Sequence, residues 1–317
     1  MIPRSIAIVI YTPLFSIVPA YAEETSEWKR LLSAPPARCV EARKELLARA
    51  TQLVQAMPRR KRALVLDVVV SGCGFMVLHY LGVHSILSRL EARGDMSLHR
   101  FAGASSGAKT PLHLLLAGEV ATMDQHLAYG DLCAQRGGSL LHAACRNDRC
   151  GRVTFEHLVE TSSAQLQAAS GRAHVCVAQL TRRGPRRAVL SEFGTDPAEV
   201  QRAREYWHAT GTLLTRVEGL GWCSDGGLAG NTPLFEDGAR DQLLVQPQRA
   251  GLPRSMVFTY TAEQAVAAVR QGQDEAAAML ARVLAEPEDA PAAVVKGDAP
   301  GRASPSGSIS IVRPEPS

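Results

Sequence analysis

The segment from Ala63 to Gly72, ALVLDVVVSG, constrains the fold of this chain more than any other stretch. It is an almost continuous run of apolar and β-branched residues that ends at glycine, which is typical of a strand buried in a parallel sheet. The helical pattern VLHYLGVHSILSRLEARG follows at once and finishes at Gly94. Because parallel strands need crossover helices between them, this order predicts an α/β fold.

The same alternation continues through the central region. A short strand, LHRFAG, a tight turn, ASSGA, and a second helical stretch follow Gly94, and RAHVCVAQL and RAVLSEF predict two strands joined by a turn at TRRGPR. A helix, DPAEVQRAREYW, precedes a short strand that ends at Asp225. We therefore expect residues 63–237 to form one α/β domain. Beyond it, a capping box of Thr261 and Gln264 opens a long predicted surface helix.

Both ends of the chain differ from this central region. Residues 1–22 join Arg4 to an apolar run that ends in Ala-Tyr-Ala, the layout of a cleavable secretory signal; an uncleaved membrane anchor is the alternative. A cleaved signal predicts the secretory route, either secretion or the endoplasmic reticulum, and an anchor predicts attachment to a membrane. Residues 23–62 are expected to form an amphipathic helical segment, residues 238–286 a C-terminal helical extension, and residues 287–317 a disordered tail.

Composition narrows the function classes only modestly. With 46% hydrophobic and 21% charged residues the chain is typical of globular proteins, and its formal charge of +4 is small for 317 residues. The basic residues are dispersed except at Arg59-Arg60-Lys61-Arg62, which argues against a broad nucleic-acid surface. That cluster can contact anionic lipid headgroups, although four neighbouring charges beside a strand are more commonly just solvated.

The cysteines predict neither a full disulfide framework nor a metal site. There are seven, an odd number, so at least one thiol stays free within a single chain. Cys145 and Cys150 flank a polar RNDR loop and could close a small disulfide in a secreted protein. Zinc would need two further ligands that no second paired motif supplies, so we expect no metal.

The pentapeptide Gly103-Ala104-Ser105-Ser106-Gly107 stands between a predicted strand and a predicted helix, which is the context of a nucleophile elbow. In such an elbow a sharp turn presents the serine hydroxyl at the edge of the sheet, and the flanking Gly103 and Gly107 avoid clashes. The first amides of the following helix favour negative charge. Ser105 is therefore a candidate nucleophile, with Ser106 as its neighbour.

A serine nucleophile needs a base, and the histidines limit the choice because all nine precede Asp225. A triad in the order serine, acid, histidine is available only through an acid such as Asp196 followed by His208, and neither has a supporting motif. The alternative is the carboxylate in Asp225-Gly226-Gly227, where two glycines allow a tight turn toward another loop. Taken alone, this tripeptide is only a turn signal.

A third element, Ser71-Gly72-Cys73-Gly74-Phe75, lies between the first buried strand and its helix. Its amides can form a nest for an oxyanion, and a single Gly-rich loop can equally hold a phosphate. A dinucleotide site would require glycine where Val77 stands, and a P-loop would require Gly-Lys-Ser/Thr. Neither nucleotide-binding motif fits well.

Taken together, the Gly-rich loop, the elbow and the distal Asp-Gly-Gly resemble the patatin-like phospholipase family. The variants SGCGF, FAGASSGA and SDGGLAGNTPLF are most similar to its animal-type branch, which includes adipose triacylglycerol lipase and adiponutrin, and the last keeps the family ending through Asn231 and Pro233. The resemblance covers residues 63–237. It implies a three-layer α/β/α sandwich with a mostly parallel central sheet.

The resemblance also implies an activity. Ser105 would be the nucleophile, Asp225 the base, and the amides around Gly72, Cys73 and Gly74 the oxyanion hole of a serine lipid acyl hydrolase. Its substrates would be triacylglycerol or glycerophospholipid, met at a membrane or lipid-droplet surface. No metal or organic cofactor is required.

Several departures from the family pattern leave room for a second function. Val77 replaces the glycine that usually closes the oxyanion loop, Pro111 follows Ser105 closely enough to kink its helix, and Lys109 is unusual. Lys109 is expected either to pair with a carboxylate or to face solvent. The stretch ATGTLLTRVEGLGW lacks the family's Ser- and Pro-containing pattern. The alternative is a catalytically weak or inactive lipid-binding or regulatory protein on the same fold.

Overall fold

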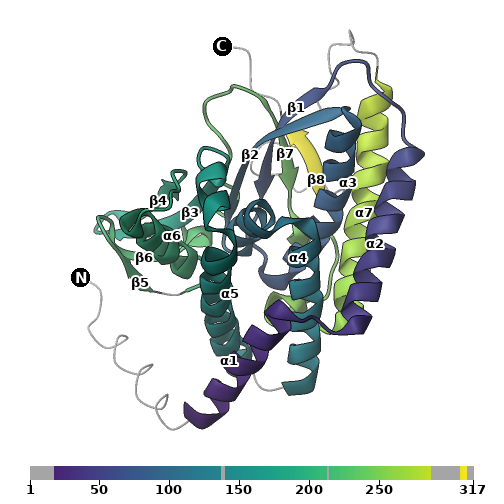
Figure 1. The fold of residues 1–317 in the computed structure, drawn as a ribbon. Coiled ribbons are helices and arrows are strands. Elements are labelled where there is room, and N and C mark those ends of the chain that lie inside the picture. The colour runs from purple at the N-terminus through teal and green to yellow at the C-terminus, as the bar shows by residue number, and fades with distance from the viewer. Residues whose placement is uncertain (1–17, 137–139, 213, 287–307, 313–317) are drawn as a thin grey trace.

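The computed structural model describes residues 18–136, 140–212, 214–286 and 308–312, with the backbone alone at 18–22 and 140–145. Among these residues, eight strands form one sheet (Figure 1). They are β1 Leu64–Val70, β2 Met96–Ala104, β3 Ala173–Thr181, β4 Gly184–Leu190, β5 Thr215–Val217, β6 Gly221–Asp225, β7 Asp241–Val245 and β8 Ile309–Val312. The order is β5-β6-β3-β2-β1-β7-β8, and β4 also pairs with β3.

The centre of this sheet is parallel and its periphery antiparallel. Strands β7, β1, β2 and β3 run in one direction, whereas β4, β5, β6 and β8 oppose their partners. β1 is buried continuously from Leu66 to Val70, as expected for the central strand of a sheet covered on both faces. The predicted α/β fold with a mostly parallel central sheet is confirmed.

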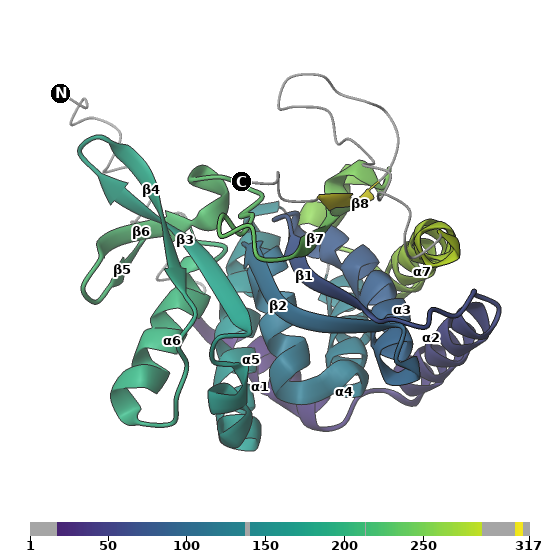
Figure 2. The same ribbon diagram turned by 90° about the horizontal axis from the view of Figure 1, so that it is seen from above.

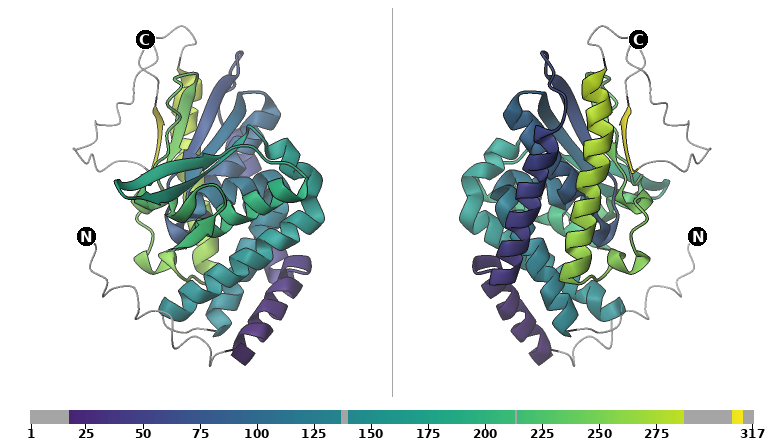
Figure 3. Two further views of the ribbon diagram at one scale, coloured as in Figure 1. Left: turned by 90° about the vertical axis from the view of Figure 1, so that its left-hand side faces the viewer. Right: turned by 90° about the vertical axis from the view of Figure 1, so that its right-hand side faces the viewer.

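Helices flank the sheet as in a three-layer α/β/α sandwich (Figure 2). They are α1 Val18–Ser33, α2 Ala37–Gln55, α3 Leu78–Arg93, α4 Ser106–Arg136, α5 Leu140–Ala169, α6 Pro197–Ala209 and α7 Ala262–Ala285. The described residues also form four short 3-10 turns: η2 Gly74–Val77, η3 Gly226–Leu228, η4 Pro247–Arg249 and η5 Arg254–Val257. Helices α2 and α7 lie side by side (Figure 3) and share one hydrophobic cluster with α3, while α4, α5 and α6 enclose a second one with β3.

Local sequence signals explain where several elements begin and end. Gly94 adopts φ +84° directly after α3, which glycine does without steric cost. The Asp196 side chain caps α6 by accepting hydrogen bonds from two backbone amides, at 2.9 and 3.1 Å. The capping box of Thr261 and Gln264 is present at α7, and the predicted strand pair is the β3–β4 hairpin.

Helix α7 is more deeply packed than the predicted surface helix. A Cβ atom at Gly82 of α3 would overlap the carbonyl oxygen of Val269, and one at Gly272 of α7 would overlap that of His79. The two backbones therefore meet where each helix carries a glycine. The face of α7 around Ala268 is buried in the core.

The sheet also extends beyond the boundaries predicted for the central domain. β7 follows residue 237 yet pairs in parallel with β1, so this part of the predicted extension belongs to the central sheet. The prediction of a disordered tail is wrong for Ile309–Val312, because these residues form β8 along β7. Residues 287–307 and 313–317 lie outside the described part of the chain.

The start of the chain is described from Val18 onward, so most of the predicted signal or anchor lies outside the described residues. Helix α1 runs through the predicted boundary at residue 22. The expected amphipathic helix is α2, which ends at Gln55. Within residues 18–136, 140–212, 214–286 and 308–312, no helix combines the length and hydropathy needed to cross a membrane.

The RNDR segment between Cys145 and Cys150 is not a loop, because α5 runs through it. Cys150 is a buried free thiol whose pKa is raised to about 12 by burial. The side chain of Cys145 lies outside the described residues.

Candidate active site

Ser105 occupies a sharp turn between β2 and α4. Its φ is +55°, and it is the one non-glycine residue in the described part of the chain with a positive φ. Such a conformation is strained for a residue with a Cβ atom, and it is the geometry that projects a nucleophile from an elbow. The carbonyl oxygen of Ser105 accepts hydrogen bonds from the amides of Ala108 and Lys109, at 3.0 and 3.2 Å. The turn is thus held by the first turn of α4.

Two glycines make this turn sterically feasible. A Cβ atom at Gly103 would overlap the carbonyl oxygen of Gly107, and a Cβ atom at Gly107 would overlap the carbonyl oxygen of Val70. Helix α4 therefore leaves β2 in direct backbone contact with both β2 and β1. The roles predicted for Gly103 and Gly107 follow from these contacts.

Strand β3 brings Ser105 and Asp225 together. One edge of β3 pairs with β4, so β2 and β6 must share the other edge, where Ala104 pairs with Cys176 and Asp225 pairs with Val177. The ends of β2 and β6 therefore meet at consecutive positions of β3. Both Ser105 and Asp225 line one cavity.

The carboxylate of Asp225 is held by two backbone amides. Its Oδ1 accepts a hydrogen bond from Gly227 at 2.8 Å, and its Oδ2 accepts one from Gly211 at 2.6 Å. Gly226 lies so close to β3 that a Cβ atom there would overlap the carbonyl oxygen of Cys176. Both glycines predicted to support Asp225 therefore have a direct role in its position.

The cavity has a volume of about 480 Å³ and a markedly apolar, aromatic part. The ring of Phe75 packs against Tyr129 and Tyr260, with centroids 5.0 and 4.9 Å apart, and Trp28 packs against Tyr129 at 5.3 Å. These four aromatic residues come from α1, η2, α4 and the loop before α7, which are far apart in the sequence. The aromatic wall therefore had no local sequence signal.

The Gly-rich loop differs from its predicted arrangement. The amide of Gly72 donates to the carbonyl oxygen of Asn231 at 3.3 Å, and that of Cys73 donates to Ser106 Oγ at 3.3 Å. The Asn231 side chain also donates to the carbonyl oxygen of Gly72 at 2.8 Å. Of the three glycine-loop residues predicted for the oxyanion hole, Gly74 lines the cavity, whereas the amides of Gly72 and Cys73 are engaged elsewhere.

Two unusual residues, Val77 and Pro111, fit the local backbone without distorting it. Val77 has φ −57°, a right-handed conformation open to any residue, so replacing glycine there strains nothing. Helix α4 is interrupted at Gly118, where φ is +79°, whereas Pro111 lies within helical backbone. The kink predicted at Pro111 therefore does not occur, and α4 is interrupted at Gly118 instead.

Lys109 neither forms an ion pair nor faces bulk solvent. It lies one helical turn beyond Ser105 and lines the cavity, with Nζ 5.4 Å from the ring centre of Trp207. Burial lowers the pKa of Lys109 to about 8, an effect that the Asp148 and Asp225 carboxylates oppose. Among the described residues, no carboxylate lies within ion-pair distance of its ammonium group.

Asp196 and His208, the acid and the histidine of the alternative triad, lie at opposite ends of α6. Asp196 caps the start of α6 and His208 lies in its last turn. Twelve residues at about 1.5 Å each place them roughly 18 Å apart. His208 is also partly buried with its pKa lowered to about 4, and it does not line the cavity. These two residues cannot act as a pair on Ser105.

Two other histidines do line the cavity and were not anticipated from the sequence. His113 and His126 face each other with ring centroids 5.9 Å apart. Burial lowers the pKa of His113 to about 3 and also lowers that of His126, so both rings are neutral near pH 7. Together with Lys109, these two histidines belong to the part of the cavity wall that α4 contributes.

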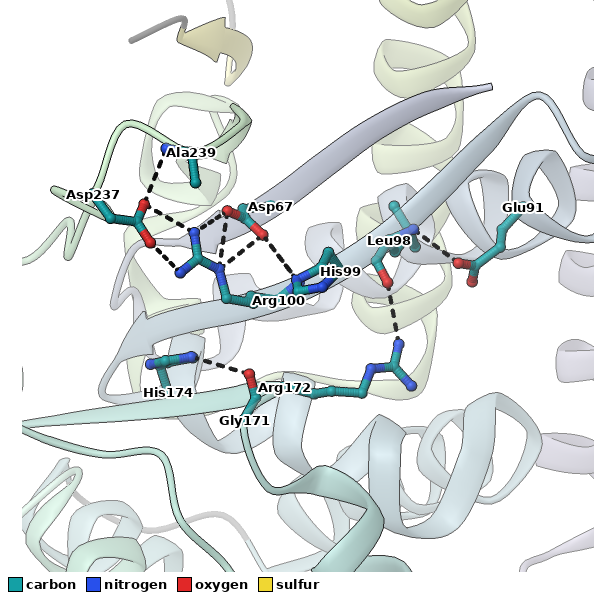
Figure 4. A network of polar contacts seen from close by, with 10 residues as sticks. All are labelled: Asp67, Glu91, Leu98, His99, Arg100, Gly171, Arg172, His174, Asp237 and Ala239. Carbon is teal, nitrogen blue, oxygen red and sulfur yellow. Dashed lines mark hydrogen bonds and ion pairs between the residues drawn. The ribbon is translucent and has the colours of Figure 1, made fainter. Parts of the chain in front are cut away.

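An ionic network that links the buried Asp67 to the exposed Asp237 anchors the loop that follows Asn231 (Figure 4). Asp67 on β1 is fully buried, and both of its carboxylate oxygens accept hydrogen bonds from Arg100 Nε at 3.1 Å. The Arg100 Nη2 atom also donates to Asp237 at 3.0 Å, and its guanidinium stacks on Phe235. The hydrogen bond from Arg100 lowers the pKa of Asp237 to about 2. The network thereby ties the loop between β6 and β7 to the sheet.

Neither a metal site among the described residues nor a known relative assigns a function to the chain. In the described ranges, no group of three or more histidine, cysteine, aspartate or glutamate side chains is arranged to hold a metal ion. No protein-family model and no curated protein shows a significant match to the chain.

Proposed function

We propose that the chain is a serine lipid acyl hydrolase of the patatin-like type, with Ser105 as nucleophile and Asp225 as base. The observation that carries this proposal is their convergence. A serine at positive φ on a strand-to-helix turn shares one cavity with a carboxylate, which an adjoining strand end delivers to the next position along β3.

The reaction follows from general chemistry. Ser105 Oγ attacks the ester carbonyl carbon while its proton passes to the Asp225 carboxylate, and the carbonyl electron pair moves to oxygen. When this tetrahedral intermediate collapses, the alcohol leaves with the proton from Asp225 and the acyl group stays on Ser105. A water molecule, deprotonated by Asp225, then attacks the acyl carbonyl carbon. The fatty acid is released and the Ser105 hydroxyl is restored.

The backbone amides of Gly74 and Ser106 are the proposed donors to the oxyanion. Each is the first residue of a helix, η2 or α4, so neither amide has an acceptor within its own helix. Both residues line the cavity, and the described residues supply no other acceptor for either amide. The N-terminal end of α4 adds a favourable dipole for the developing negative charge.

The apolar part of the cavity suits an acyl chain. Its aromatic wall of Trp28, Phe75, Tyr129 and Tyr260 offers large apolar surfaces, and a volume of about 480 Å³ is within the usual range of ligand pockets. Burying an acyl chain there stabilises the complex by about 0.8 kcal/mol for each methylene group removed from water. A lipid ester therefore fits the site better than a small polar ester.

The surface beside the cavity supports a lipid interface as partner. Leu228, which lines the cavity, is 60% exposed, and Trp222 on β6 is 55% exposed. The β3–β4 hairpin, which projects from the body of the molecule (Figure 2), carries four arginines close to its tip. They are Arg182, Arg183, Arg186 and Arg187. Exposed apolar side chains beside clustered arginines suit an anionic membrane or lipid-droplet surface.

A lipid-binding or regulatory protein without activity is the second candidate. It is favoured by the amides of Gly72 and Cys73, which already donate within the protein and leave fewer donors for an oxyanion. The two candidates differ in chemistry and share the cavity.

Fatty-acid release from mixed vesicles of triacylglycerol and phospholipid separates them. The full chain is compared with Ser105→Ala, in which only the hydroxyl oxygen is removed. Release by the parent that disappears in Ser105→Ala supports the hydrolase. Vesicle binding without release in either protein supports the non-catalytic candidate.

A further inference from the structure

Lys109 is a charged group in the cavity that the proposed reaction does not use. Its Nζ atom lies 3.6 Å from the positions that Cβ atoms would take at Gly151 and Gly211, and 5.4 Å from the ring centre of Trp207. Helices α5 and α6 and the turn after α6 therefore form a close wall around the ammonium group. Lys109 also lines the cavity and is only partly buried, so its side chain is accessible from the cavity.

The carboxylates near Lys109 are already engaged. Asp148 forms an ion pair with Arg152 at 3.0 Å, and both oxygens of Asp225 accept backbone hydrogen bonds. Among the described residues, Lys109 therefore has only the face of Trp207 and more distant carboxylates to offset its charge. A partly desolvated ammonium group with three N–H donors gains most from an anion brought by the ligand.

We propose that Lys109 binds an anionic group of the substrate and is the residue that selects charged acyl esters over neutral glycerides. The inference rests on the proposed function, since it names the class of ester that reaches Ser105. This role also explains why a lysine stands at this position of α4. A neutral triacylglycerol would leave the ammonium group without a partner.

The position of Lys109 sets where the anionic group must lie. The Lys109 amide donates to the carbonyl oxygen of Ser105 at 3.2 Å, and both residues line the cavity, so the two side chains lie one helical turn apart at the start of α4. In a glycerophospholipid, five covalent bonds of about 1.5 Å separate the phosphorus atom from the nearer ester carbonyl carbon, a comparable span. A phosphate beside the scissile ester is therefore within reach of Lys109.

Two substrates that differ only in the phosphate test this selection. We compare kcat/KM for dioctanoyl phosphatidic acid and dioctanoylglycerol in the parent, Lys109→Met, Lys109→Arg and Lys44→Met, a matched change at an exposed lysine on α2. The ratio of the two values is expected to fall about tenfold or more in Lys109→Met, because a charge-assisted hydrogen bond is lost. Lys109→Arg is expected to retain most of the preference, and Lys44→Met all of it. Equal losses on both substrates in Lys109→Met would overturn the proposal and make Lys109 a positioning residue for Asp225.

A binding measurement keeps the inference separate from the hydrolase proposal. In the Ser105→Ala protein, calorimetry with dodecyl phosphate, dodecanoate and dodecanol reports the anion preference without any turnover. Both anions are expected to bind about tenfold or more tightly than dodecanol, and Lys109→Met is expected to remove the difference. The ratio between dodecyl phosphate and dodecanoate shows whether a phosphate or a product carboxylate is preferred. Equal affinity for all three ligands would contradict the role of Lys109, and absent hydrolysis with a retained preference would contradict only the hydrolase.

Discussion

The two halves of the candidate site are held in different ways. Ser105 and Asp225 lie at strand ends, and their proximity is set by backbone pairing with consecutive residues of β3. The Gly-rich loop leaves the end of β1, and the direction of its amides is set by single contacts to Asn231 and Ser106. Sheet register therefore fixes the proposed reacting pair, whereas the amides of Gly72 and Cys73 are held by a few replaceable hydrogen bonds.

Removing the proposed base, Asp225, should have the largest effect on the rate of hydrolysis. Asp225→Asn leaves the side chain the same size but unable to take a proton, so kcat is expected to fall by about 10⁴-fold. One of the amides of Gly211 and Gly227 would also face an NH₂ group. Initial rates on a short-chain ester measure the effect, with circular dichroism as the control for folding. A loss smaller than about tenfold would show that another group serves as the base.

Breaking the ionic network of Asp67, Arg100 and Asp237 should have the next largest effect. Arg100→Met removes the guanidinium partner of the buried Asp67 and leaves only the backbone amide of residue 100 as a donor, which is expected to lower the free energy of unfolding by about 3–5 kcal/mol. Urea unfolding measures this change. The control is Arg187→Met, which removes the exposed pair with Glu236 and is expected to cost less than about 1 kcal/mol. Equal effects of the two substitutions would show that the network of Figure 4 does not stabilise the fold.

A smaller effect is expected when the Gly-rich loop is displaced. A Cβ atom at Gly72 would lie 2.6 Å from Asn231 Oδ1 and 2.9 Å from the Cβ atom of Ser105. Gly72→Ala should therefore push the loop from both, and kcat/KM is expected to fall by about 10²-fold. Gly94→Ala is the control, because its φ of +84° makes alanine strained in open space remote from the cavity. Matching rates in parent and Gly72→Ala would show that the loop takes no part in catalysis.

The smallest effect is expected at Ser106. Its hydroxyl oxygen accepts the Cys73 amide, so Ser106→Ala frees that amide for an oxyanion. The rate is expected to stay within about threefold of the parent, because one weak hydrogen bond is lost as a donor is gained. Initial rates are measured for the parent, Ser106→Ala and Ser105→Ala under the same conditions. A collapse as deep as that of Ser105→Ala would identify Ser106 as the nucleophile instead.

Much of the fold could be predicted because its signals are local. The buried run of β1, the glycine after α3, the β3–β4 hairpin and the capping box of α7 are each contained in one short segment. Strands β5, β7 and β8 were missed because each has only three to five residues, and β7 and β8 also owe their pairing to distant partners. The helical course of α5 through a polar stretch was missed for a similar reason, since tertiary packing decided it.

In the candidate site, too, the features with local signals could be predicted and those that depend on distant segments could not. The elbow around Ser105 and the Asp-Gly-Gly turn are readable because glycine is required where backbones touch. The amide directions at Gly72 and Cys73 were not readable, since Asn231 lies 159 residues beyond Gly72 in the chain. The surroundings of Lys109 likewise come from Gly151, Trp207 and Gly211 on other elements.

Covalent labelling with a fluorophosphonate, followed by mass spectrometry of the labelled peptide, identifies the nucleophile directly. If Ser105 is the nucleophile and Asp225 its base, we expect one adduct on Ser105 in the parent, the same adduct in Ser106→Ala, and slower labelling in Asp225→Asn. An adduct on Ser106, or labelling of Ser105 at the same rate with and without the Asp225 carboxylate, would contradict this assignment.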